Sequence, residues 1–190
     1  TLADRRADQV MAYLSAKLPP ERILITRSVV DGAPATLADA ARTRGLAIMV
    51  AISPCIDITY SDPAEKALLH RRLNQILSIG VTDIALLFDD IPSELNAVDA
   101  QAFASFADAQ IHIVNACHAY GLSKDRRTRI YFCPTEYCAA FAKHDVTGSL
   151  YLNTIGEGLA PEIEIFWTGP DIVSEAITTP SVIEIGRVLR

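Results

Sequence analysis

The stretch Ile84-Ala85-Leu86-Leu87-Phe88-Asp89-Asp90-Ile91 decides the fold, because two adjacent carboxylates follow an uninterrupted apolar run. Such a run is typical of a strand that is covered on both faces of a parallel sheet. The two acids then fall at the carboxyl end of the strand, where parallel α/β folds gather their catalytic groups. Neighbouring residues of a strand point to opposite sides, so we expect one acid to reach a pocket from its centre and the other from its rim.

The pair Asp89 and Asp90 suits acid–base chemistry. Adjacent carboxylates repel each other, and a nearby like charge or partial burial raises a carboxyl pKa, so one acid stays protonated near neutrality while the other is ionised. A proton donor and an anion are then available together. Two other interpretations stay open from the pair alone, namely a helix N-cap acid beside a solvated neighbour, and a divalent metal site.

The rest of the chain alternates between short apolar runs and longer amphipathic stretches, which is typical of βα units on a parallel sheet. The pattern predicts helices at Asp4–Met11, Ala35–Arg44, Pro63–Leu77, Val98–Tyr120 and Tyr151–Leu159. It predicts strands at Ala12–Ser15, Leu46–Ile52, Ile84–Phe88, Arg129–Cys133 and Ile163–Trp167. Gly45, Gly80 and Gly121 are expected to end three of the helices. About five βα units over residues 1–190 predict a single domain, a partial or compact (β/α) TIM-type barrel, since a closed barrel has eight.

Composition argues against two classes of partner. Half of the residues are hydrophobic and the formal charge is -6. A nucleic-acid surface needs clustered Lys and Arg, whereas the arginine pairs of this chain are isolated. No apolar run approaches the roughly 20 residues of a membrane span, and no signal peptide is visible. The four cysteines form no CxxC motif or dense disulfide pattern, so we expect a reducing, cytoplasmic location, or the nucleus if the source is a eukaryote.

Polar or unusual residues follow four of the predicted strands. They are Ser53-Pro54, Asp89-Asp90, Pro134-Thr135-Glu136-Tyr137-Cys138 and Trp167-Thr168-Gly169-Pro170. In a parallel fold these segments lie on one rim, which is where a barrel enzyme builds its pocket.

With these motifs the sequence resembles the O-GlcNAcases, retaining β-N-acetylglucosaminidases of glycoside hydrolase family 84. The resemblance rests on Ala51-Ile52-Ser53-Pro54, on Leu86 to Ile91, on Phe132 to Cys138 and on Trp167 to Pro170, in the family's order and approximate spacing. It runs from about Met11 to the C-terminus. It implies a hydrolase that acts on β-linked N-acetylglucosamine attached to protein serine or threonine, without a metal or organic cofactor.

The resemblance also implies roles for the two acids. Asp89 matches the acid that orients and polarises the substrate's 2-acetamido group, whose oxygen attacks the anomeric carbon. Asp90 matches the general acid that protonates the leaving oxygen and later the base that activates water. Because the substrate supplies the nucleophile, the usual carboxylate separation rule does not apply, and the anomeric configuration is expected to be retained.

Four further residues match substrate-binding positions of the family. Tyr137 matches a tyrosine whose hydroxyl contacts the reacting centre, and Cys133 and Thr168 match positions that line the pocket for the acetyl methyl group. Lys17 matches a lysine that binds sugar hydroxyls. Each also has a purely structural interpretation: a half-buried aromatic for Tyr137, small core residues for Cys133 and Thr168, and a solvated surface side chain for Lys17.

The sequence also departs from the family. The family's first strand with its glycine-rich turn, and the later strands that bind sugar hydroxyls, have no counterpart between Thr1 and Arg190. The chain is therefore expected to be a fragment, a piece completed by another polypeptide or by a second copy of itself, or a diverged relative.

The rival function is a catalytically silent module that binds glycosylated protein or a partner chain. The two acids and Tyr137 favour the enzyme, because a pure binding module needs no general acid. A metal site at the acid pair is the third interpretation, and no nearby third carboxylate or histidine supports it.

Overall fold

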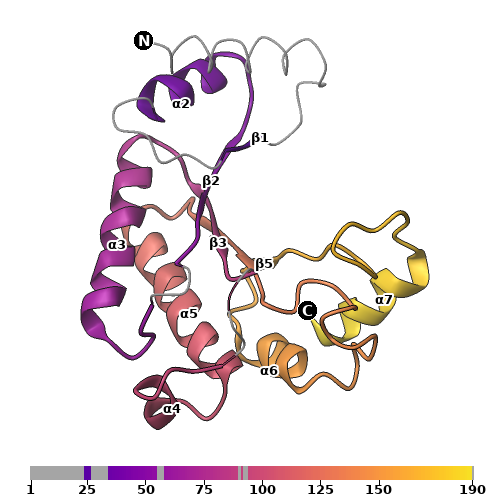
Figure 1. Cartoon of the computed structure of the whole chain (residues 1–190). Coiled ribbons are helices and arrows are strands. Elements are labelled where there is room, and N and C mark those ends of the chain that lie inside the picture. The colour runs from indigo at the N-terminus through magenta and orange to yellow at the C-terminus, as the bar shows by residue number, and fades with distance from the viewer. Residues whose placement is uncertain (1–23, 27–33, 55–57, 90, 92–93, 190) are drawn as a thin grey trace.

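The computed structural model describes residues 24–26, 34–54, 58–89, 91 and 94–189. Within them, five strands form one parallel sheet in the sequential order β1-β2-β3-β4-β5 (Figure 1). The strands are β1 Leu24–Thr26, β2 Ile48–Ile52, β3 Asp83–Leu87, β4 Arg129–Cys133 and β5 Glu164–Ile165. The helices are α2 Pro34–Thr43, α3 Pro63–Ser78, α4 Asp99–Ala102, α5 Phe106–Lys124, α6 Leu150–Gly158 and α7 Thr179–Val188. The predicted α/β class with a parallel sheet is thus confirmed.

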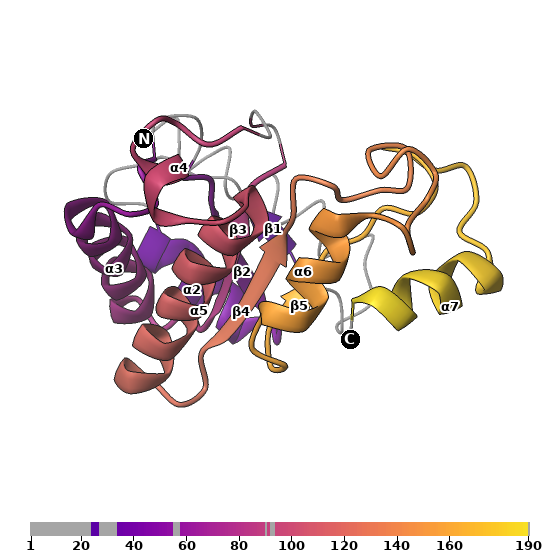
Figure 2. The same cartoon turned by 90° about the horizontal axis from the view of Figure 1, so that it is seen from below.

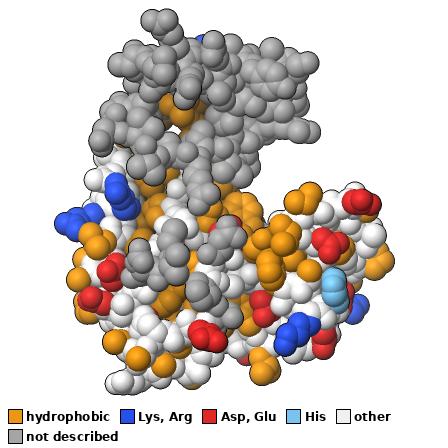
Figure 3. All heavy atoms as spheres, in the orientation of Figure 1, with side chains coloured by type: hydrophobic (Ala, Val, Ile, Leu, Met, Phe, Trp, Pro, Cys, Tyr) orange, Lys and Arg blue, Asp and Glu red, His pale blue; other side chains and the backbone are white. Residues whose placement is uncertain are grey.

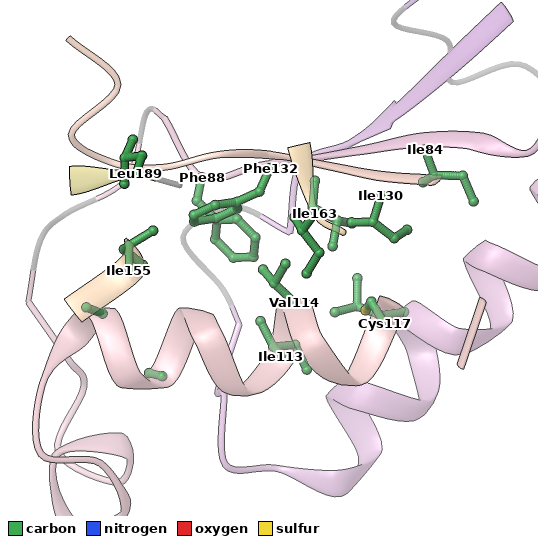
Figure 4. Packing of buried hydrophobic residues seen from close by; sticks show 14 of the residues in the cluster. Ile84, Phe88, Ile113, Val114, Cys117, Ile130, Phe132, Ile155, Ile163 and Leu189 are labelled. Carbon is green, nitrogen blue, oxygen red and sulfur yellow. The ribbon is translucent and has the colours of Figure 1, made fainter. Parts of the chain in front are cut away.

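The main core lies between the sheet and the helices. Alternate residues of β3 and β4 face α5, whose Ile113, Val114 and Cys117 pack under Ile84 and Ile130 (Figure 4). Helices α3 and α5 contact each other and lie against the same side of the sheet (Figure 2). Full burial of one such aliphatic side chain contributes about 1.5–3 kcal/mol, so this layer fixes the positions of the central strands.

A second, smaller cluster contains intervening residues of the same strands, Leu87 and Cys133, together with residues that follow β4 and β5. Cys133, Tyr137 and Cys138 are buried together, with the half-buried Leu87 and Phe166 packed against them. Leu87 and Cys133 are register partners in neighbouring strands. The two clusters follow from strand alternation, which sends successive side chains to opposite faces.

Local sequence signals explain where helix α3 begins and ends. Asp62 caps α3 by accepting a 2.8 Å hydrogen bond from the Ala64 N–H, and Pro63 is the first helical residue. Gly80, after α3, has a φ of 79°, which few other residues adopt. The predicted boundaries of this helix are therefore correct to within a residue.

The prediction of one helix over Val98–Tyr120 closed by Gly121 is wrong. The chain forms α4, then an extended Phe103 with φ -125° and ψ 144°, and then α5. Ser105 starts α5, because its hydroxyl accepts a hydrogen bond from the Asp108 N–H at 3.1 Å. Gly121 lies inside α5, where a Cβ atom would approach the Thr128 methyl group to 2.7 Å, so this glycine permits close packing rather than ending the helix.

The C-terminal helix α7 was not predicted. Thr178 caps its N-terminus, and Ile185 and Val188 are buried against the core. Gly156 of α6 allows this approach, since a Cβ atom there would collide with the Val188 carbonyl. Five other apolar side chains between β5 and the end of α7 are at least half exposed, namely Ile172, Val173, Ile177, Val182 and Ile183. Hydrophobic side chains are accordingly visible on the surface of this C-terminal part of the chain (Figure 3).

The remaining predictions have mixed outcomes. Strand Arg129–Cys133 is observed with the predicted bounds, whereas strand Ile163–Trp167 is reduced to β5. Strand β1 was not predicted, and the predicted helix Asp4–Met11 and strand Ala12–Ser15 lie outside the described residues. Within the described ranges, no helix is both long and apolar enough to cross a membrane.

Candidate active site

The four polar segments singled out in the sequence follow the ends of β2, β3, β4 and β5. Ser53 follows β2, Asp89 follows β3, Pro134 follows β4 and Trp167 follows β5. Because the strands are parallel neighbours, their carboxyl ends meet at one edge of the sheet. The predicted common rim is therefore present.

Asp89 is half-buried and directly follows Phe88, which is anchored at three points. The Phe88 N–H donates a 2.9 Å hydrogen bond to the Cys133 carbonyl, and the Phe88 carbonyl accepts a 2.7 Å hydrogen bond from the Thr135 hydroxyl. The Phe88 ring is fully buried, with ring centroids 6.1 Å from Tyr60 and 5.7 Å from Phe132. Phe88, the residue before Asp89, is thereby fixed to the end of β4 and to the segment that follows it.

Tyr137 and Thr168 are brought together by a short backbone ladder. The Thr168 N–H donates to the Tyr137 carbonyl at 2.9 Å, and the Ala139 and Ala140 N–H groups donate to the carbonyls of Gly169 and Pro170 at 3.0 and 2.9 Å. The Tyr137 ring is nearly buried and lies edge-on to Phe141, with centroids 5.1 Å apart. The segments that follow β4 and β5 thus form one unit.

Gly169 is required by the turn in that unit. Its φ is 97°, and a Cβ atom there would lie 2.9 Å from the Ser174 hydroxyl oxygen and 3.0 Å from a side-chain carbon of Ile177. The Thr168 hydroxyl donates a 2.8 Å hydrogen bond to the Asp171 carbonyl and so closes the same turn. The half-buried Thr168 side chain is held beside the Cys133–Tyr137 segment by these contacts.

Beneath this unit lies a buried polar network that joins α5 and α6 to the segment after β4. The Gln110 side-chain amide donates to the Thr135 hydroxyl at 3.0 Å, and the Thr135 N–H donates to the Tyr151 hydroxyl at 2.9 Å. The Tyr151 hydroxyl in turn donates to the Gln110 amide oxygen. Burial raises the pKa of Tyr151, so its phenol is neutral and able to donate this hydrogen bond.

Asp99 is a second buried polar residue at this edge. Burial alone would raise the pKa of its carboxyl, but hydrogen bonds from the Ser61 hydroxyl, from the backbone N–H groups of Ser61 and Tyr60, and from the Asn96 amide outweigh that effect and lower it. Asp99 is therefore an anion that ties the loop after β2 to the loop after β3.

Comparison with known proteins decides the family. A model of the β-N-acetylglucosaminidase (NAGidase) family matches residues 33–190. The chain belongs to the β-N-acetylglucosaminidase family. The predicted resemblance is thus confirmed.

The relatives of this chain are longer proteins. It is 43% identical over 155 residues, or 82% of its length, to the protein O-GlcNAcases of Mus musculus and Rattus norvegicus, and spans 17% of each. A solved structure of a mutant Thermobaculum terrenum O-GlcNAc hydrolase superposes with a TM-score of 0.83 at 26% identity. That match covers 97% of this chain and 42% of the hydrolase chain.

Two of the predicted site residues, Asp90 and Lys17, lie outside the described residues. Asp89, Cys133, Tyr137 and Thr168 lie at the carboxyl edge, and their roles toward a substrate stay predictions. Among the described residues, no group of three His, Cys, Asp or Glu side chains is placed to hold a metal ion.

Sequence reasoning missed Asp99, Gln110 and Tyr151 as parts of the site's support. Gln110 carried a usable signal: Ile113, Val114 and Cys117 follow it by three, four and seven residues, so it lies on the apolar face of the predicted helix, where a glutamine needs hydrogen-bond partners. Asp99 carried no such sequence signal, because an acid near the start of a helix is ordinarily interpreted as a solvated charge that stabilises the helix N-terminus.

Proposed function

We propose that this chain is the catalytic segment of a glycoside hydrolase that removes β-linked N-acetylglucosamine from serine or threonine of glycoproteins. The observation that carries the proposal is the hydrogen bond from the Phe88 N–H to the Cys133 carbonyl. It places Asp89 beside the segment that contains Cys133 and Tyr137, in a chain that belongs to a β-N-acetylglucosaminidase family.

The sheet is proposed to be part of a (β/α) barrel. Its strand order is sequential, without the reversal of a doubly wound sheet, and α3 and α5 cover the same face. The opposite face, with Leu87, Cys133 and Tyr137, then corresponds to the barrel interior. Substrate sites of such barrels lie at the carboxyl ends of the strands, where Asp89 is found.

In the proposed first step the substrate supplies its own nucleophile. Asp89 accepts a hydrogen bond from the acetamido N–H, which raises the electron density on the acetamido oxygen as that oxygen bonds to the anomeric carbon. The bond to the serine or threonine oxygen breaks, and Asp90 gives its proton to that oxygen. The products are a bicyclic oxazolinium ion, whose N–H stays hydrogen-bonded to the Asp89 carboxylate, and the free hydroxyl side chain.

In the proposed second step Asp90, now an anion, takes a proton from water while the water oxygen bonds to the anomeric carbon. The bond between the anomeric carbon and the oxazolinium oxygen breaks, and the neutral acetamido group is restored with its N–H still hydrogen-bonded to Asp89. Each step inverts the anomeric carbon, so the configuration is retained overall.

The remaining residues have proposed binding roles. Tyr137 offers its hydroxyl to the reacting centre, Cys133 and Thr168 line the space for the acetyl methyl group, and Lys17 binds sugar hydroxyls. The partner is an O-GlcNAc-modified protein or another N-acetylglucosaminide, met in the cytoplasm, or in the nucleus if the source is a eukaryote. In this proposal no nucleic acid, membrane or cofactor takes part.

The test compares two aryl β-glycosides that differ only at C2. The purified chain is expected to cleave the N-acetylglucosaminide and to leave the glucoside, which lacks the acetamido nucleophile, essentially intact. Equal cleavage of the two would contradict substrate assistance. Cleavage of neither by a folded chain would contradict the proposed activity.

A further inference from the structure

Thr135 holds the residue that precedes the acid pair. Its hydroxyl donates a 2.7 Å hydrogen bond to the carbonyl of Phe88, and the peptide unit that contains this carbonyl leads directly into Asp89. A carbonyl held in this way cannot rotate without breaking the hydrogen bond, so the backbone direction of Asp89 depends on the Thr135 side chain.

The direction of every hydrogen bond around Thr135 is determined by chemistry. The Gln110 NH2 group can only donate, so the Thr135 hydroxyl oxygen accepts from it at 3.0 Å and must turn its own proton to the Phe88 carbonyl. The Thr135 N–H donates to the Tyr151 hydroxyl, which donates to the Gln110 amide oxygen. The four groups form a closed ring with one outgoing hydrogen bond, and that bond ends on Phe88.

The network is built into the helices that cover the sheet. Gln110 on α5 is fully buried, and Phe106 of the same helix packs on the Tyr151 ring of α6 with centroids 6.3 Å apart. Chains of hydrogen bonds in a low-dielectric interior strengthen one another and select a single side-chain arrangement. Two rigid helices therefore set the position of Thr135.

We infer that Thr135, fixed by Gln110 and Tyr151, is a positioning residue that aims Asp89 at the substrate by anchoring the Phe88 carbonyl. The inference rests on the proposed function of the acid pair. Thr135 does not touch the substrate in this account. It acts through Phe88, and a small loss of alignment of a general acid or an acetamido-orienting carboxylate is enough to slow the reaction by about 100-fold.

Three variants of the full 190-residue chain test the inference. Thr135→Val keeps the shape and removes the hydroxyl, and Thr135→Ser keeps the hydroxyl and removes the methyl group. The matched control is Thr128→Val. Like the hydroxyl of the half-buried Thr135, the hydroxyl of the buried Thr128 donates to the backbone, here to the Asp125 carbonyl at 2.7 Å with the Gly121 carbonyl at 3.2 Å, but at the amino end of β4.

The first readout is amide hydrogen exchange, which needs no turnover. Thr135→Val is expected to speed exchange of the Phe88 amide proton about tenfold or more while the amides of α3 keep their wild-type rates, and Thr135→Ser is expected to restore protection. Thr128→Val should not affect Phe88 selectively. Equal acceleration over the whole chain in Thr135→Val would overturn the inference, since it would reveal only a loss of global stability.

The second readout is hydrolysis of an aryl β-N-acetylglucosaminide. Thr135→Val is expected to lower kcat about 10- to 100-fold with little change in KM, while Thr135→Ser and Thr128→Val stay close to wild type. An unchanged kcat in Thr135→Val, or an equal loss in Thr135→Ser, would overturn the inference. Absence of turnover in the wild-type chain would instead contradict the proposed function, and the Phe88 exchange rate would then decide the anchoring by itself.

Discussion

Asp99 holds Ser61 by two hydrogen bonds to one carboxylate oxygen. The backbone N–H and the hydroxyl of Ser61 donate to Asp99 Oδ1 at 2.8 and 2.7 Å. The other oxygen accepts from the Tyr60 N–H at 2.9 Å and from the Asn96 amide at 2.7 Å. Because Ser61 follows β2 and Asp99 follows β3, one buried side chain fixes two neighbouring loops at the edge that contains Asp89.

Asp99→Asn is expected to destabilise the chain by about 2 kcal/mol. The asparagine keeps one acceptor oxygen but turns an NH2 group toward the N–H groups of Tyr60 or Ser61, so at least one buried donor loses its partner. Urea unfolding at pH 7 measures the loss. The result that would contradict this account is a variant as stable as the wild type.

The effect of Asp99→Asn on stability should depend on pH. Asp99 has a folded-state pKa below its unfolded value of about 3.9, so its ionisation stabilises the fold above that value, and the stabilisation is lost as pH falls through the lower, folded-state pKa. The difference in unfolding free energy between wild type and Asp99→Asn should therefore be constant near neutrality and shrink below about pH 4. A difference that grows on acidification would show that the sign is wrong.

Two tyrosines near Gln110 should respond differently to loss of the hydroxyl. Tyr151→Phe removes two hydrogen bonds and leaves the Thr135 N–H and the Gln110 amide oxygen without that partner, which should cost about 2 kcal/mol, or roughly 4–8 °C in Tm.

Tyr60→Phe is the matched control for Tyr151→Phe. The buried Tyr60 hydroxyl lies near the Gln110 side chain but makes no hydrogen bond of normal geometry among the described residues, and burial raises its pKa to about 12. Removing it should change Tm little or raise it. Equal losses in the two variants by thermal unfolding would contradict the assigned hydrogen bonds.

Two glycines test the turn that holds Thr168. Gly169→Ala should destabilise the chain by about 1–2 kcal/mol, because φ is 97° and the new Cβ atom would meet Ser174 and Ile177. Gly186→Ala, in α7 and with no heavy atom within 4 Å of its Cβ position, should be neutral or stabilise by about 0.5–1 kcal/mol. Denaturant midpoints measure both, and the reverse order would refute the account of the turn.

The two acids are expected to differ in their dependence on the leaving group. Asp90→Asn should slow cleavage of aryl glycosides with poor leaving groups far more than of those with good ones, because only poor leaving groups need a proton. Asp89→Asn should slow both to a similar degree, since acetamido attack is needed in either case. The logarithm of kcat/KM against leaving-group pKa measures this, and an equal response of Asp90→Asn to both classes would rule out its role as general acid.

The sequence predicted the central part of the fold well because its signals there are local. Apolar runs such as Ile84–Phe88 and Arg129–Cys133 identified buried parallel strands, and the proline and glycine around α3 set its ends. The carboxyl-edge location of Asp89, Cys133, Tyr137 and Thr168 followed from the strand ends alone.

The remaining features depend on contacts between distant residues. The break between α4 and α5 depends on Ser105, which caps α5 within an otherwise helical pattern. Gly121 is a glycine because it packs closely against Thr128, not because the chain turns there. Likewise, Gln110 and Thr135 meet only after β4 folds against α5. Periodicity does not encode such pairings, so the support of the site appears only in three dimensions.

The most direct test of the account is hydrolysis of an aryl β-N-acetylglucosaminide by the purified 190-residue chain, with Asp90→Asn measured beside it. Folding of both proteins is checked by circular dichroism. The account predicts turnover by the wild-type chain that is greatly reduced in Asp90→Asn for a poor leaving group. Turnover that is the same in both proteins, or absent from a folded wild-type chain, would contradict it.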